Sequence, residues 1–214
     1  MNETLMRINV CGIVPVIKLN DAGNAVPLAD ALFAGGIDVM EITFRTPAAR
    51  DAIERVSRSR PEMLVGAGTV LNEETLNAAK DAGAKFIVSP GLNPATVRVA
   101  QNAGLPIIPG VLTPTEIELG LSLGIEVFKF FPAENFGGIS AVHAIAAPYG
   151  NIKFVPTGGI NADNASDYFK SDKVFAVGGS WMVTEELTDS GDWAEITRLT
   201  REATTLLKII RHGR

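Results

Sequence analysis

The chain has 214 residues and a net charge of −5, and 46% of its residues are hydrophobic. These values are typical of one globular domain, and the acidic balance argues against nucleic acid or an anionic membrane as the partner, because both need a basic face. Cys11 is the single cysteine, which excludes an intramolecular disulfide and is consistent with a reducing cytoplasm. We expect no signal peptide and no membrane span, because no long apolar run occurs.

Short apolar runs alternate with longer segments of helical spacing. The expected strands are residues 12–17, 39–43, 64–67, 86–89, 106–110, 127–131, 154–157 and 174–178. The expected helices are residues 26–34, 48–59, 73–82, 94–102, 114–123, 139–147, 164–170 and 193–211, with an additional N-terminal helix over residues 3–10. Eight alternating units predict an α/β fold, a (β/α)8 TIM barrel, as one domain over residues 1–214. A doubly wound open sheet is the alternative, but it usually has fewer strands.

Helix N-caps are expected at four polar residues that precede the helical segments. They are Asn72, Asn93, Thr113 and Asn161. The side-chain oxygens of such residues accept hydrogen bonds from the first free N–H groups of a helix. These positions support the predicted boundaries.

Lys129 interrupts an otherwise apolar strand. Because side chains alternate along a strand, Lys129 lies on one face and the aromatic Phe128 and Phe130 lie on the other, which suits the face that packs against helices. Lys129 therefore points into the barrel, and by the same alternation Glu41 points inward from the second strand. A buried structural ion pair is the alternative, but such pairs are costly and often add little net stability.

A desolvated lysine beside a carboxylate suits one kind of chemistry. Burial disfavours the charged form of a lysine, and a neutral amine attacks carbonyl carbons to form a Schiff base. Such a reaction moves protons, and a carboxylate within reach can carry them. We therefore expect Lys129 and Glu41 to be catalytic.

Further polar residues stand at the C-terminal strand ends, where barrel active sites lie. Arg45 follows the second strand and can bind a carboxylate through two parallel hydrogen bonds, although a rim salt bridge is the alternative. The stretch GAGT ends the third strand in Thr69, and SPG ends the fourth around Pro90. We expect both residues to line the pocket.

Glycine pairs end the seventh and eighth strands, in TGG (157–159) and VGGS (177–180). In this fold a phosphate site commonly forms after those strands. Glycines let backbone N–H groups approach phosphate oxygens, and a serine can add a hydroxyl. The expected substrate-binding residues are Thr157, Gly158, Gly159, Gly179 and Ser180.

We expect no catalytic role for several other residues that could be considered. His143 lies on an expected helix and His212 near the C-terminus, so we expect no histidine-based metal site. Trp181 is interpreted as core packing or as part of the pocket wall. Lys18, Asn20 and Asp21 are interpreted as a solvated loop.

Six stretches resemble a known family in the same order along the chain. They are EITFRTPAA (41–49), VGAGTVLN (65–72), VSPG (88–91), EVFKFFPAE (126–134), PTGGI (156–160) and GGSWM (178–182). They resemble the 2-keto-3-deoxy-6-phosphogluconate and 4-hydroxy-2-oxoglutarate aldolases, over about residues 12–205. Phe44 departs from the leucine that the family often has, and we expect its side chain to point away from the pocket.

The resemblance implies a metal-independent class I aldolase without a cofactor. It implies cleavage of 2-dehydro-3-deoxy-6-phosphogluconate to pyruvate and glyceraldehyde 3-phosphate, action on 4-hydroxy-2-oxoglutarate, and a homotrimer. It implies that Lys129 is the Schiff-base lysine and Glu41 the general acid/base. The substrate-binding positions that it implies are Arg45, Thr69, Pro90 and Phe131 around the pyruvate half, and Gly158, Gly159, Gly179 and Ser180 around the phosphate.

Three alternatives remain open at this point. The substrate can be the galactonate-derived epimer, which differs only at C4. A phosphosugar isomerase or epimerase, or a non-catalytic phosphate-ligand binding protein, needs the phosphate glycines but no lysine that attacks a carbonyl. Neither of the last two forms a covalent adduct.

Overall fold

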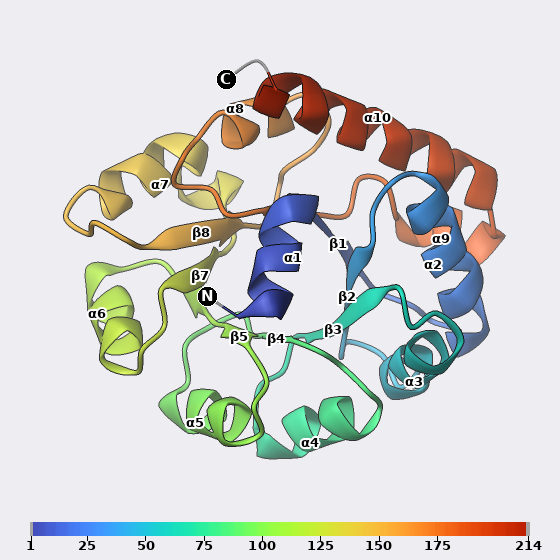
Figure 1. Ribbon diagram of the computed structural model, residues 1–214, viewed down its shortest axis with the longest axis horizontal. Helices are drawn as coiled ribbons and strands as arrows, with labels where there is room; N and C mark the ends of the chain where they lie inside the picture. Colours follow the sequence, from blue (N-terminus) through green and yellow to red (C-terminus); the bar gives the residue numbers. More distant parts are fainter. Residues whose placement is uncertain (1, 213–214) are drawn as a thin grey trace.

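The computed structural model describes residues 2–212, which form parallel strands surrounded by helices (Figure 1). The strands are β1 Ile13–Ile17, β2 Val39–Thr43, β3 Leu64–Gly68, β4 Ile87–Val88, β5 Ile107–Ile108, β6 Gly110–Val111, β7 Val127–Phe130, β8 Lys153–Pro156 and β9 Val177–Gly179. The α-helices are α1 Glu3–Cys11, α2 Ala25–Ala34, α3 Ala49–Ser59, α4 Glu73–Asp81, α5 Pro94–Asn102, α6 Pro114–Ser122, α7 Gly138–Ala146, α8 Ala165–Phe169, α9 Glu185–Ser190 and α10 Trp193–His212. Two short 3-10 helices, η1 Ala22–Asn24 and η2 Glu134–Phe136, complete the order.

The strands form two parallel sheets instead of one sheet of eight. One sheet has the order β5-β4-β3-β2-β1-β9 and the other β6-β7-β8. The expected fifth strand is divided at Pro109, which has no N–H to donate to a ladder. Its carbonyl still accepts a hydrogen bond of 2.8 Å from the N–H of Lys129. The prediction of an α/β fold with parallel strands is confirmed. The structure differs from the predicted eight-stranded barrel in that its strands form two sheets.

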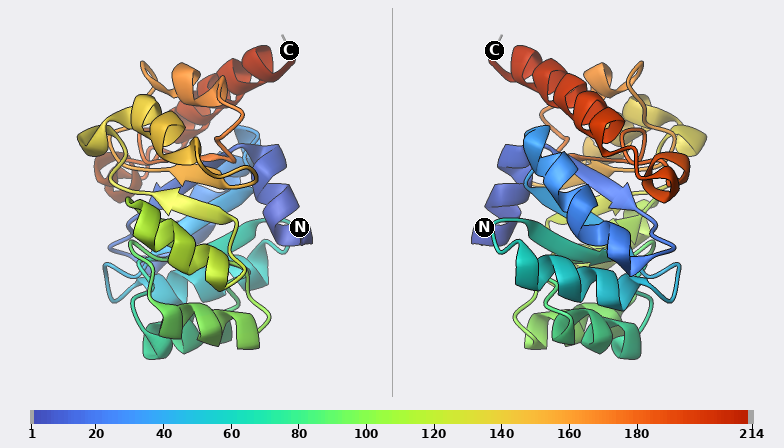
Figure 2. Two further views of the ribbon diagram at one scale, coloured as in Figure 1. Left: turned by 90° about the vertical axis from the view of Figure 1, so that its left-hand side faces the viewer. Right: turned by 90° about the vertical axis from the view of Figure 1, so that its right-hand side faces the viewer.

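The two sheets also approach each other beside β9. Isolated parallel bridges join Phe154 to Val174 and Thr157 to Gly178. In Figures 1 and 2 the strands surround the centre of the molecule and the helices other than α1 lie outside them, with α10 beside α2. The C-terminal ends of all these strands therefore face one side of the molecule.

Apolar side chains form two clusters, one on each side of the strands. The outer cluster, between strands and helices, includes Phe128 and Phe130. The inner cluster includes Val39 and Val127 and is covered by Ile8 of α1, which is fully buried. Figure 1 shows α1 over the centre of the strands, so the expected N-terminal helix is confirmed. The predicted alternation along β7 is confirmed as well.

Most expected helix boundaries agree with the structure. The side chains of Asn72, Asn93 and Thr113 cap their helices, and Thr113 forms a capping box with Glu116. Asn161 is not an N-cap, because α8 begins later; its side chain instead accepts a hydrogen bond from the N–H of Asp163. The sequence prediction missed α9, a short and mostly polar helix without apolar periodicity.

Candidate active site

The side chains of Lys129 and Glu41 contact each other on the inner side of the strands, as the alternation predicts. The side chains lie on β7 and β2, and the residues are 6% and 3% exposed. Nζ of Lys129 lies 3.6 Å from Oε1 of Glu41 and 5.1 Å from the centre of the Phe131 ring. The Nζ–Oε1 separation is an ion-pair contact but too long for a good hydrogen bond. Oε1 is buried and accepts no hydrogen bond from the described residues.

Two glycines of β3 leave space on the inner side of the strands, Gly68 for Glu41 and Gly66 for Phe86. A Cβ at Gly68 would lie 2.0 Å from Oε1 of Glu41, and one at Gly66 would lie 2.3 Å from the ring of Phe86. Real Cβ atoms do not approach other atoms so closely, so both positions need a residue without a side chain. Within the stretch GAGT, Gly68 therefore leaves the space that the Glu41 carboxylate occupies.

Thr69 and Pro90 lie at the neighbouring strand ends. Thr69 follows Gly68 and has a φ of 58°, which is unusual for a β-branched residue and costs backbone strain. Pro90 lies close to Gly110, because a Cβ there would stand 2.0 Å from the Pro90 carbonyl oxygen. Gly110 pairs in register with Lys129. The segment around Pro90 therefore lies close to the strand pair that carries the lysine.

Arg45 stands on the rim at the end of β2. Its Nε donates a hydrogen bond of 3.0 Å to Oγ1 of Thr43, and that hydroxyl donates one of 2.7 Å to the carbonyl of Ile17. Arg45 is exposed, whereas Thr43 is buried. The chain of hydrogen bonds orients the guanidinium. Phe44 packs against the outer cluster, which supports the expectation that it points away from the pocket.

The glycine pairs lie at adjacent strand ends, joined by the bridge from Thr157 to Gly178. Gly158 and Gly159 have φ values of 101° and 79°, which favour glycine. A Cβ at Gly179 would lie 1.9 Å from the ring of Trp181, which packs against the outer cluster. Trp181 is therefore a packing residue, and this packing requires a glycine at position 179. Ser180 follows it and is exposed.

The loop after β1 is more than a solvated segment. Nζ of Lys18 lies 2.6 Å from Oε2 of Glu185, and Nδ2 of Asn20 donates to Oδ2 of Asp189 at 3.1 Å. The interaction with Lys18 lowers the pKa of Glu185. Asn20 and Asp21 are exposed, as the solvated-loop interpretation predicts, but that interpretation missed the contacts of Lys18 and Asn20 with α9.

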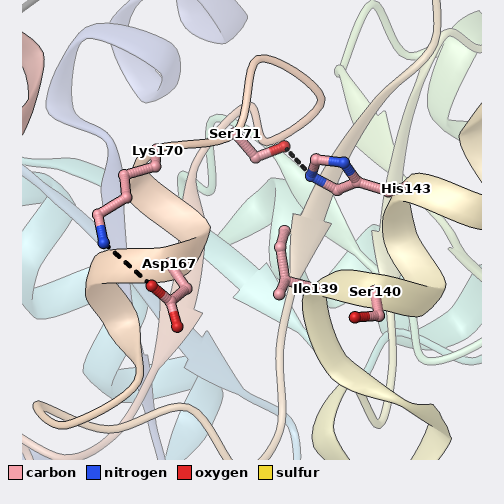
Figure 3. Close-up of a pocket in the computed structure, with 6 residues that line it drawn as sticks. All are labelled: Ile139, Ser140, His143, Asp167, Lys170 and Ser171. Carbon is pink, nitrogen blue, oxygen red and sulfur yellow. Dashed lines mark hydrogen bonds and ion pairs between the residues drawn. The ribbon is translucent and has the colours of Figure 1, made fainter.

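A separate hollow of about 420 Å³ lies between α7 and α8 (Figure 3). Four of its lining side chains are paired, because Ser171 Oγ and His143 Nε2 share a hydrogen bond of 2.9 Å and Lys170 lies 3.1 Å from Asp167. None of the expected site residues lines it. Among the side chains of residues 2–211, no group of three or more His, Cys, Asp or Glu could hold a metal ion, and no helix in the described part of the chain is long and apolar enough to cross a membrane.

The fold and the site define an α/β enzyme with a buried lysine and carboxylate at the strand ends. The family model for KDPG and KHG aldolase matches residues 5–199. A 2-dehydro-3-deoxy-phosphogluconate aldolase of Haemophilus influenzae is 47% identical over 206 residues, which cover 96% of this chain and 97% of the relative. A KHG/KDPG aldolase of Escherichia coli K12 is 46% identical, covering 89% of this chain and 90% of the relative.

Solved structures agree with this relationship. The KDPG aldolase of Legionella pneumophila, with pyruvate captured at low pH as a covalent carbinolamine intermediate, has a TM-score of 0.90 at 40% identity. That match covers 94% of this chain and 97% of the other. The chain belongs to the KDPG and KHG aldolase family. It is an aldolase, which is a carbon–carbon lyase.

Proposed function

We propose that this aldolase cleaves 2-dehydro-3-deoxy-6-phosphogluconate to pyruvate and glyceraldehyde 3-phosphate through a Schiff base on Lys129. The single observation that carries the proposal is the buried contact of 3.6 Å between Lys129 and Glu41. The relatives that share 46–47% identity carry the names of this activity. Because the chain belongs to an aldolase family, we no longer consider it an isomerase, an epimerase or a non-catalytic binding protein.

The reaction begins at Lys129. Its neutral amine attacks the C2 ketone of the substrate, and Glu41 transfers protons as the carbinolamine loses water to give the imine. Removal of the proton from the C4 hydroxyl then breaks the C3–C4 bond, and the imine accepts the electron pair as an enamine. Glyceraldehyde 3-phosphate leaves. Protonation of C3 and hydrolysis of the imine release pyruvate and restore the amine, so a separate cofactor is not needed.

Substrate binding divides between two ends of the site. Arg45 binds the carboxylate next to C2 through its guanidinium, and Thr69, Pro90 and Phe131 surround that half of the substrate. The phosphate binds at the two glycine turns, with Thr157, Gly158 and Gly159 on one turn and Gly179 and Ser180 on the other. Support comes from the position of all these residues at the C-terminal strand ends.

The remaining parts of the proposal concern architecture and setting. The two sheets act as one eight-stranded barrel, with β5 and β6 as one strand bent at Pro109 and the bridges beside β9 as the other junction. Residues 1–214 form one catalytic domain. The homotrimer rests on the family resemblance, and the cytoplasmic location rests on the single cysteine, Cys11. The enzyme also accepts 4-hydroxy-2-oxoglutarate.

Trapping with pyruvate tests the covalent step. Incubation with pyruvate and sodium borohydride, followed by peptide mapping, should place a reduced adduct on Lys129. Lys129→Ala should give no adduct and no cleavage. Lys153→Ala, which changes a lysine at the opposite end of the neighbouring β8, should trap pyruvate like the wild type. An unmodified Lys129 in the wild-type protein would overturn the mechanism, and comparison of rates on the two C4 epimers identifies the sugar series.

A further inference from the structure

Tyr168 is a buried residue of α8 that interacts with a distant segment. It is 1% exposed, and its hydroxyl donates a hydrogen bond to Oε1 of Glu134. Burial raises the pKa of Tyr168, and the neighbouring carboxylate raises it further. The hydroxyl therefore keeps its proton at neutral pH and donates the hydrogen bond to Glu134. Glu134 belongs to the segment that follows β7, five residues after Lys129.

Glu134 lies directly against the glycine turn of residues 157–159. Its side chain covers Gly159, because a Cβ there would lie 2.6 Å from Cβ of Glu134. On its other side the carboxylate faces Gly138, where a Cβ would lie 2.9 Å from Oε1. The pair of Glu134 and Tyr168 thus fills a space that exists because residues 138 and 159 are glycines.

All three carbonyl groups of the glycine turn accept hydrogen bonds from neighbouring segments. The carbonyls of Thr157 and Gly158 accept hydrogen bonds of 2.8 and 3.1 Å from the N–H groups of Ala133 and Glu134. The carbonyl of Gly159 accepts one of 3.1 Å from Nδ2 of Asn164. In a trans peptide the C=O and the following N–H point in opposite directions. The N–H groups of Gly158 and Gly159 therefore point away from residues 133 and 134.

We propose that Glu134 and Tyr168 are positioning residues that hold this turn with its N–H groups directed at the substrate phosphate. The inference rests on the proposed function, which places the phosphate at the glycine turn. Without the hydroxyl of Tyr168, the Glu134 side chain loses the contact that holds it against Gly159. The turn then varies in position, while Lys129 and Glu41 keep their strand positions on β7 and β2.

The effect is a change in selectivity for phosphorylated substrate. Tyr168→Phe removes only the hydroxyl, and a lost hydrogen bond of this kind should raise KM for 2-dehydro-3-deoxy-6-phosphogluconate roughly five- to tenfold. The kcat at saturation should stay close to the wild-type value, because the turn does not take part in bond cleavage. KM for unphosphorylated 4-hydroxy-2-oxoglutarate should also stay unchanged, since this substrate has no phosphate to bind.

The chain offers a matched control, because it has two tyrosines. The hydroxyl of Tyr149 also contacts a glutamate, Oε1 of Glu118 at 3.4 Å, but on the surface of the molecule. Tyr149→Phe should change neither KM. A second pair of variants tests the acceptor: Glu134→Ala should raise KM for the phosphorylated substrate, and Glu134→Gln, which keeps an oxygen for the Tyr168 hydroxyl, should raise it less.

The two proposals fail in different experiments. A wild-type protein that forms no pyruvate adduct on Lys129 contradicts the proposed function. A wild-type protein that traps pyruvate, combined with a Tyr168→Phe protein whose KM for the phosphorylated substrate is unchanged, overturns the positioning role. Equal losses on both substrates also overturn it, because they indicate only a structural role. If Tyr168→Phe does not fold, the Glu134→Ala and Glu134→Gln proteins decide by the same comparison of the two substrates.

Discussion

Nζ of Lys129 lies 3.6 Å from Oε1 of Glu41, and this oxygen accepts no hydrogen bond from the described residues. A buried polar atom without a hydrogen-bond partner is costly, and such exceptions in folded proteins need an explanation. A purely structural pair would be expected to approach to about 2.7–2.9 Å, the length of a charge-assisted hydrogen bond. The longer contact suits a pair that acts together on a substrate atom.

Glu41→Gln tests the proton-transfer role. The amide keeps the shape of the side chain but cannot carry the proton, so we expect kcat to fall roughly 10²- to 10⁴-fold. Steady-state cleavage kinetics measure this, and thermal melting checks that the protein remains folded. Glu126→Gln, an exposed change just before β7, serves as the control and should cleave normally. A Glu41→Gln protein with the wild-type rate would assign proton transfer to another group.

Gly68→Ala should displace the carboxylate of Glu41. The added Cβ would lie 2.0 Å from Oε1, so the side chain must move and the protein should lose about 1–3 kcal/mol of stability. Activity should fall further than stability explains, because the lysine–carboxylate contact is lost. Urea unfolding and kcat measure the two effects. Gly150→Ala is the control, since no atom lies within 4 Å of its added Cβ. Normal activity in Gly68→Ala would show that the carboxylate position is unimportant.

The alternation along single strands was enough to predict that Lys129 and Glu41 both point inward. Lys129 and Glu41 are inward residues of short strands whose other face is apolar, and a period of two is a local property. The strand ends were also predictable, because glycines and caps mark them. Thr113 and its capping box show how strongly local chemistry fixes a helix start.

Long-range contacts could not be predicted in the same way. Lys18 and Glu185 are 167 residues apart, and nothing near either residue indicates that α9 lies beside the loop after β1. The division of the sheet at Pro109 depends on which neighbour each half pairs with, which is again a tertiary property. The contact between Tyr168 and Glu134 is of the same kind. Sequence patterns therefore predicted that Lys129 and Glu41 lie on the inner face of the strands, but not which distant residues contact one another.

Cys11 should be a slowly reacting thiol in the folded protein. Burial, together with the charge of Asp38, raises its pKa from 9.0 to about 11. Because the folded pKa is raised, this group stabilises the fold fully below pH 9 and loses that contribution as the pH rises through 11. A disulfide reagent at pH 8 should therefore modify the native protein much more slowly than the urea-unfolded protein. Equal rates would show that the thiol is accessible in the native state.

Arg45→Lys tests the orientation of the rim guanidinium. Lysine keeps the charge but loses the planar fork that binds a carboxylate through two hydrogen bonds, and it also loses the Nε bond to Thr43. We expect KM for the 2-keto acid substrates to rise roughly tenfold, equivalent to one charge-assisted hydrogen bond, with a smaller change in kcat. Phosphorylated and unphosphorylated substrates should be affected equally, because both carry the carboxylate.

Thr43→Val examines the same orientation without altering the charge. It removes the hydroxyl that accepts from Nε of Arg45 and donates to the carbonyl of Ile17. KM should rise in the same direction as for Arg45→Lys but less, and the double variant should show less than the sum of the two effects because the residues act through one contact. Arg58→Lys, an exposed change on α3, is the control and should behave like the wild type. Additive effects of the two rim substitutions would mean that Thr43 does not act by orienting Arg45.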